Sequence, residues 1–102
     1  NIVYNNNDVS VFYNGGPYFI LPEKAQNIET LAYYNYEQKS LPAIVKVKYG
    51  QGLVILSGVH FEYDTYKLDK NDVYLKKIIP ILSKNKNETE KLAISLIKHL
   101  GI

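Results

Sequence analysis

The chain has 102 residues, of which 46% are hydrophobic, and a net charge of +2 at pH 7. This length suits one compact domain with a modest core, and the composition argues against disorder. The charge is too small to indicate binding to nucleic acid or to an anionic membrane, and the absence of cysteine excludes disulfides, thiolate metal sites and a cysteine nucleophile within these residues.

The first part of the sequence has the pattern of short β-strands. The stretch "DVSVFYN" at 8–14 alternates and is rich in β-formers, which predicts a strand. "NGGP" at 14–17 predicts a turn, because glycine adopts unusual dihedral angles and proline fixes the exit. We expect two more strands in "YFIL" at 18–21 and "IETLAYYN" at 28–35.

The middle of the sequence continues the strand pattern. We expect a loop at 37–42, a strand with outward lysines at 43–49, and a tight "GQG" turn at 50–52. "LVILSGV" at 53–59 is a continuous apolar run of strand length. Such a run favours a strand that is buried on both faces, as in a sheet covered by helices.

The last third has helical periodicity. Apolar residues recur at helical spacing within 72–84, at Leu75, Ile78, Ile79 and Leu82. Asp69 or Asn71 would cap this helix, and Pro80 predicts a kink or an end near Ile79.

A second helix is predicted after a capping box. In "NETE" Asn87 would be the cap and Glu90 its partner three residues later. An apolar stripe follows, made of Leu92, Ala93, Leu96, Ile97 and Leu100. Gly101 is a natural helix end. The pattern therefore predicts one α/β domain over 1–102, with strands first and two helices at the C-terminal end.

His60 and Glu62 follow the predicted buried strand and are candidates for chemistry. Residues two apart in an extended segment point to the same side, so Glu62 is placed to accept the Nδ1–H of His60 and to orient the ring. The alternative is a loop histidine that is solvated or bonded to backbone. Asp64 adds a second carboxylate, but a metal site needs a further ligand from elsewhere, and we predict no metal.

The corner "YNGGPY" is a second candidate. Its backbone N–H groups around Tyr13, Asn14, Gly15 and Gly16 have the character of an anion-binding corner, although the lysine and spacing of a phosphate loop are missing. A structural turn is the alternative. The ten tyrosines favour core edges or an interface over base stacking, because no basic stripe accompanies them.

These pieces occur in an order that resembles a known family. "FYNGGPYF", "IETLAYYN", "PAIVKVKYGQGLVILSGVHFEYD" and "LIKHLGI" resemble the class I glutamine amidotransferase-like domain at the N-terminus of fungal-type biotin–protein ligases and of related proteins. The resemblance implies a flavodoxin-like sheet of the amidotransferase type. It also implies that His60 and Glu62 occupy the places of the catalytic histidine and its orienting glutamate, with Phe61 where the family's H-P-E motif has proline.

In that family the histidine acts with a cysteine that lies earlier in the domain. The chain has no methionine and begins at Asn1, so we expect the C-terminal half of such a domain, inactive by itself and without a cofactor. Its expected partners are the upstream half of its own domain or, through an exposed sheet edge, another copy. No apolar run approaches the roughly 18 residues that span a bilayer, no signal peptide opens the chain, and we expect a cytoplasmic protein without membrane contact.

Two other interpretations remain open at this point. In the first, the chain is a non-catalytic ligand-sensing or protein-interaction module, the "YNGG" corner and the tyrosines form its binding surface, and His60–Glu62 is a relic. In the second, it is an ordinary small α+β domain unrelated to the family.

Overall fold

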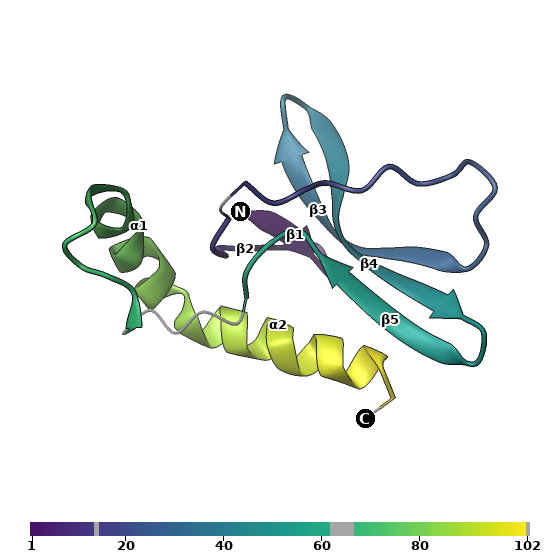
Figure 1. Ribbon diagram of the computed structural model, residues 1–102. Coiled ribbons are helices and arrows are strands. Elements are labelled where there is room, and N and C mark those ends of the chain that lie inside the picture. Colours follow the sequence, from purple (N-terminus) through teal and green to yellow (C-terminus); the bar gives the residue numbers. More distant parts are fainter. Residues whose placement is uncertain (14, 62–66, 102) are drawn as a thin grey trace.

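The computed structural model describes residues 1–13, 15–61 and 67–101. Its strands precede its helices, as the sequence pattern predicts (Figure 1). In chain order the elements are β1 (Ile2–Tyr4), β2 (Asn7–Val9), β3 (Ile28–Tyr36), β4 (Lys39–Tyr49), β5 (Gly52–Ser57), α1 (Val73–Lys84) and α2 (Lys86–His99). The strands form one sheet in the order β2-β1-β3-β4-β5, and each pairing in it is antiparallel.

Tight turns connect most neighbouring strands. Asn5 and Asn6 join β1 to β2, and Glu37 and Gln38 join β3 to β4, with φ angles of 48° and 64° at each pair. Positive φ at both central residues is typical of the hairpin turn whose twist matches that of the strands. The loop predicted at 37–42 is therefore wrong, because β4 already begins at Lys39.

Pro42 lies inside β4 and not at the end of a loop. It pairs with Tyr33 next to a shift in the β3–β4 register, where Ala32 pairs with Ile44 and Ala43 is the additional residue. A proline is tolerated in a sheet at such an irregularity because a ladder hydrogen bond is interrupted there. The irregularity brings both Ala43 and Ile44 into the core.

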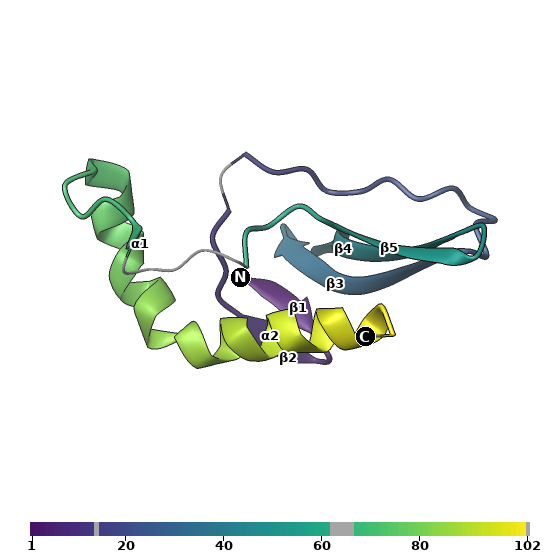
Figure 2. The ribbon, with the colours of Figure 1, turned by 60° about the horizontal axis from the view of Figure 1, so that its bottom comes forward.

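The predicted strands at 8–14 and 18–21 are corrected by the structure. β2 ends at Val9, and residues 18–21 form no strand, although the Phe19 N–H donates to the Pro42 carbonyl at 3.0 Å. β1 was missed by the sequence pattern, and it pairs with both β2 and β3. Both edges of β1 are therefore already paired, and the segment after β2 cannot add to this strand. It passes over the sheet instead (Figure 2).

β5 is an edge strand, and the prediction that it is buried on both faces is wrong. Its residues alternate between exposed and half-buried, with Val54 and Leu56 42% and 44% exposed. Because the described strands are all antiparallel, the described residues do not show the flavodoxin-like sheet that the resemblance implies.

The core lies between the sheet and α2. Leu92 and Leu96 of α2 are almost completely buried against residues of the strands, and the Tyr4 hydroxyl forms a hydrogen bond with the Ser95 hydroxyl. The buried strand residues of this core are Ile2, Tyr4, Val9, Ala32, Ala43 and Ile44. Figure 2 shows α2 on one side of the sheet and the segment that leads to β3 on the other.

The two helices confirm the predicted periodicity but not the predicted caps. The Asp72 carboxylate caps α1 by accepting the Tyr74 and Leu75 N–H groups at 2.9 and 3.0 Å. α1 continues through Pro80 to Lys84. Pro80 has no N–H that could donate to the carbonyl of Lys76, four residues earlier in the helix. Lys76 is exposed, so water can bind this carbonyl.

α2 begins one residue after α1 ends. Asn85 separates the two helices, so Asn87 lies within the first turn of α2 and the predicted capping box is wrong. At the other end Gly101 has a φ of 79° just after the helix, which confirms the predicted end. Among the described residues, no helix is both long and apolar enough to cross a membrane.

Candidate functional site

The two stretches singled out in the sequence lie against each other. The His60 N–H donates to the Phe12 carbonyl at 2.7 Å, which joins the end of β5 to the segment before the glycine corner. Gly16 and Gly58 meet backbone to backbone: a Cβ on Gly16 would lie 1.9 Å from the Gly58 carbonyl oxygen, and a Cβ on Gly58 would lie 2.0 Å from the Pro17 carbonyl oxygen. We call this the glycine contact.

The end of β5 is shaped by its own polar groups. The Ser57 hydroxyl donates to the Val59 carbonyl at 2.8 Å and accepts from the Val59 N–H at 3.2 Å. The Gly58 N–H still donates to Ala43 of β4 at 2.9 Å. The strand therefore ends in a turn that is held by the Ser57 hydroxyl and by the hydrogen bond from Gly58 to β4. This turn sets the position of the His60 backbone.

The His60 side chain is half-buried and lies beside an aromatic ring. Its centroid is 5.8 Å from that of Phe12, with the ring planes tilted by 40°. Glu62 and Asp64 lie outside the described residues. The pairing of His60 with Glu62 therefore stays a prediction.

Two tyrosines hold the glycine corner. The Tyr13 hydroxyl donates to the Gly16 carbonyl at 2.7 Å, and the Tyr34 hydroxyl donates to the Pro17 carbonyl at 3.0 Å. Their rings meet edge to face, with centroids 5.7 Å apart. Burial raises the pKa of Tyr34 to about 12, and the neighbouring Tyr13 adds to the effect. The Tyr34 hydroxyl therefore acts as a neutral donor at physiological pH.

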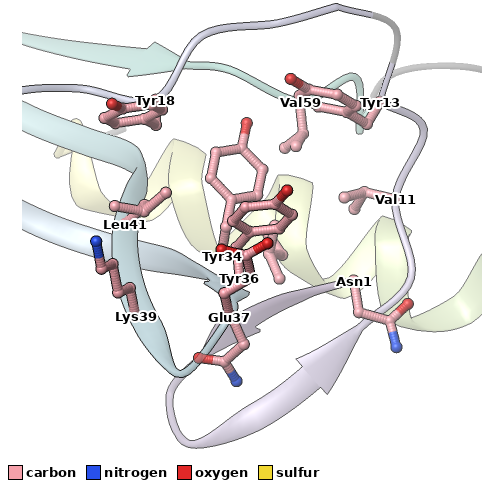
Figure 3. A pocket seen from close by; sticks show the side chains of 12 residues that line it. Asn1, Val11, Tyr13, Tyr18, Tyr34, Tyr36, Glu37, Lys39, Leu41 and Val59 are labelled. Atoms are coloured by element: carbon pink, nitrogen blue, oxygen red, sulfur yellow. The ribbon is translucent and has the colours of Figure 1, made fainter.

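A cavity of about 550 Å³ opens between this corner and the β3–β4 hairpin (Figure 3). This volume lies in the range of small-molecule sites. Four tyrosines, four aliphatic residues and four polar or charged residues line it. The lining residues are Asn1, Ile2, Val11, Tyr13, Tyr18, Tyr34, Asn35, Tyr36, Glu37, Lys39, Leu41 and Val59.

The cavity overlaps only in part with the residues predicted to bind a ligand. Tyr13 lines it, whereas Gly15 and Gly16 are not lining residues and Asn14 lies outside the described residues. His60 is not a lining residue, although its neighbour Val59 is. Tyr34 and Tyr36 also line the cavity. The sequence pointed to them only as part of the tyrosine-rich character of the chain in the interaction-module interpretation, and they were not among the residues predicted to bind a ligand.

The described part of the chain holds no group of three or more His, Cys, Asp or Glu side chains that could bind a metal ion. The described residues offer an imidazole whose backbone is fixed, a tyrosine-lined cavity, and two tyrosine hydroxyls that already donate to carbonyl groups.

Comparison with known proteins gives two matches. The family model described as "Biotin-protein ligase, N terminal" matches residues 1–102. A biotin–protein ligase of Schizosaccharomyces pombe (strain 972 / ATCC 24843) is 35% identical over 68 residues, which cover 61% of this chain and 10% of that protein. The match thus spans about a tenth of the length of the curated relative. No solved structure matches the chain.

Proposed function

Because the chain belongs to the family of biotin–protein ligase N-terminal domains, we propose that it forms one part of such a domain and that the domain is of the class I glutamine amidotransferase-like type. In this proposal His60 and Glu62 are one half of a site whose nucleophilic cysteine comes from elsewhere in the polypeptide. The described antiparallel strands would be one portion of the larger sheet.

The observation that supports this proposal most is the contact between the two stretches. The glycine contact and the hydrogen bond from His60 to Phe12 fix the histidine backbone relative to the glycine corner. A general base must stand at a fixed place relative to its nucleophile, and a rigid backbone beside it meets this requirement.

The proposed chemistry divides among three groups. A cysteine thiolate attacks the glutamine amide carbon, His60 moves the proton between the thiol and the leaving ammonia, and Glu62 holds the imidazole in the required tautomer. The 102 residues contain no cysteine. We therefore propose that this chain is inactive by itself.

The test uses the complete polypeptide that contains this chain and a glutamine analogue that alkylates cysteine. Labelling should be slower in a His60→Asn variant by about a hundredfold or more, because the base that activates the thiol is lost. His99→Asn, a half-buried histidine in α2, is the matched control and should label at the original rate. Equal labelling in the His60 variant would refute the base role.

A second experiment isolates Glu62. A Glu62→Gln variant should slow the labelling while the fold is retained, because the imidazole loses the carboxylate that orients it. Loss of labelling in proportion to loss of fold, measured by circular dichroism, would point to a structural role instead.

The cavity favours a second candidate, a non-catalytic ligand-sensing module. The tyrosine-lined cavity lies beside the glycine corner but does not include His60, whose ring packs beside Phe12. A small aromatic ligand would find tyrosine rings and aliphatic side chains there.

Indole is a suitable probe for this candidate. Its binding should change the NMR chemical shifts of Tyr18 and Tyr36, and a Leu41→Ala change in the cavity lining should weaken the effect. Shift changes spread over the whole surface, or none at all, would count against a ligand site in the cavity.

A further inference from the structure

Phe12 is a buried phenylalanine in a segment that forms neither a helix nor a regular strand. It lies between the end of β2 at Val9 and the glycine corner, and its side chain is 7% exposed. Among the described residues, the buried cluster between the sheet and α2 does not include it. Its burial therefore belongs to another part of the molecule, and the backbone bridge that it forms with His60 indicates which part.

The bridge places the side chains of Phe12 and His60 on the same face of the two segments. Directly opposite residues of an antiparallel pair point to one side, and their neighbours along each segment point to the other. The neighbours Val11 and Phe61 pack against the core, and Val59 belongs to it. Phe12 and His60 therefore face away from this core together, with ring centroids 5.8 Å apart.

We propose that Phe12 is a positioning residue, whose ring sets the direction in which the His60 imidazole points. This proposal rests on the base role of His60 in the proposed function. The Phe12 carbonyl accepts the His60 N–H at 2.7 Å and so fixes the histidine backbone. The ring adds the restraint on the side chain, because a histidine has three staggered positions about χ1 and a buried ring beside it leaves fewer of them open.

A phenyl ring suits this role because it has no hydrogen-bond donor or acceptor. It restricts the imidazole by contact and does not compete for either of its nitrogens. The proposed function assigns these nitrogens to Glu62 and to the thiol. A polar side chain in the place of Phe12 would restrict the imidazole by binding one of the groups that the reaction uses.

Phe12 is itself held from both directions along the chain. Before it, Val11 packs against the core, and after it the Tyr13 hydroxyl donates to the Gly16 carbonyl at 2.7 Å. Gly16 in turn lies against Gly58, two residues before His60. The segment that carries the phenyl ring and the segment that carries the imidazole therefore support each other, as the precise placement of a base requires.

The test compares two phenylalanines in the complete polypeptide that contains this chain. Phe12→Leu keeps a large apolar side chain but removes the ring, and labelling of cysteine by the glutamine analogue should slow about tenfold because the base is less well oriented. Phe19→Leu is the matched control. Phe19 is half-buried and its N–H donates to Pro42 of β4, so this variant should label at the original rate.

A double variant separates positioning from a general loss of structure. In a polypeptide that already carries His60→Asn, Phe12→Leu should change the labelling rate by less than about twofold, because a residue that acts through His60 has no base left to orient. Phe12→Leu at the original rate, or an equally large loss with and without His60, would overturn the proposal.

NMR of the histidine side chains tests the same inference without the labelling of a cysteine. The His60 signal is the one that is lost in the His60→Asn variant. Phe12→Leu should move this signal toward that of a mobile histidine, because both the ring current and the restraint are removed, and the His99 signal should stay in place.

An unchanged His60 signal in Phe12→Leu would overturn the proposal. A His60 signal that moves, together with labelling at the original rate in the His60→Asn variant, would refute the base role and support the orienting contact. The proposal and the proposed function therefore fail separately.

Discussion

At the residue scale, the glycine contact leaves no room for a side chain at Gly58. A Cβ there would lie 2.0 Å from the Pro17 carbonyl oxygen and 2.6 Å from the Tyr34 hydroxyl oxygen. Because the first clash is with backbone, no rotamer change can relieve it. We expect Gly58→Ala to lower the free energy of unfolding by about 3 kcal/mol, measured by denaturant titration.

Gly52→Ala is the matched control for this change. Gly52 also belongs to β5, and its nearest atom to a new Cβ is the Tyr49 carbonyl oxygen at an ordinary 3.4 Å. Its stability should stay within about 0.5 kcal/mol of the original chain. Equal effects at both glycines would show that the contact with the corner is not what restricts Gly58.

Tyr34 gives the protein a specific response to alkaline pH. An unfolded tyrosine loses its proton near pH 10, whereas burial raises the pKa of Tyr34 in the folded chain to about 12. Between these values the folded state keeps a proton that the unfolded state has released. The free energy of unfolding should therefore fall as pH rises from about 10 to about 12.

A Tyr34→Phe variant should show a smaller decline over that range, measured by denaturant unfolding at a series of pH values. Tyr49→Phe, at an exposed tyrosine, should decline like the original chain. A Tyr34→Phe variant with the full decline would assign the pH response to other groups.

The candidate site could be predicted from sequence only where it is local. The polar end of an apolar strand at 57–60 is visible in the residues themselves. The partner of His60 is the Phe12 carbonyl, and any residue type supplies a carbonyl, so no side-chain pattern marks it. The pairing of Gly16 with Gly58 likewise depends on where two distant segments cross.

At the element scale, the start of α1 distinguishes the observed cap from the predicted ones. Asp72 accepts two N–H groups of the first turn, so Asp72→Ala should cost about 1 kcal/mol of the free energy of unfolding. Asn87 was predicted as a cap but lies inside α2, and Asn87→Ala should change stability by less than about 0.5 kcal/mol. A larger loss at Asn87 than at Asp72 in thermal unfolding would contradict these assignments.

The elements themselves were predictable where periodicity is strong. β3, the second part of β4, and both helices follow their sequence patterns. The β3–β4 turn was not predictable, because Glu37 and Gln38 adopt positive φ without the glycine or asparagine that usually marks such turns. β1 was missed because three residues are too few to show alternation.

At the scale of the whole molecule, α2 covers the core of the sheet with two buried leucines, Leu92 and Leu96. Leu96 is 3% exposed and packs with the buried strand residues, so Leu96→Ala should cost about 3 kcal/mol of the free energy of unfolding. Ile94 lies on the same helix but is mostly exposed, and Ile94→Ala should cost less than about 1 kcal/mol. Similar losses in denaturant unfolding would show that α2 is not anchored through Leu96.

Strand direction and position in the sheet could not be predicted at this scale. The apolar run at 53–59 is equally consistent with a central strand and with an edge strand that awaits a partner. The sequence pattern shows that β5 is apolar but does not show which strands lie beside it. Its neighbours depend on the two-residue turns, which make the sheet antiparallel.

The hydrogen bond between Tyr4 and Ser95 joins residues 91 positions apart, whereas β3, β4 and β5 follow one another through turns of two residues. Closing a short loop costs little chain entropy, and closing a long one costs more and takes longer. We expect the three-strand meander to form first during folding, as a scaffold with a half-built core. The β1–β2 hairpin and α2, which are far apart in the sequence, then pack onto that scaffold and complete the core, so the contacts of longest range form last.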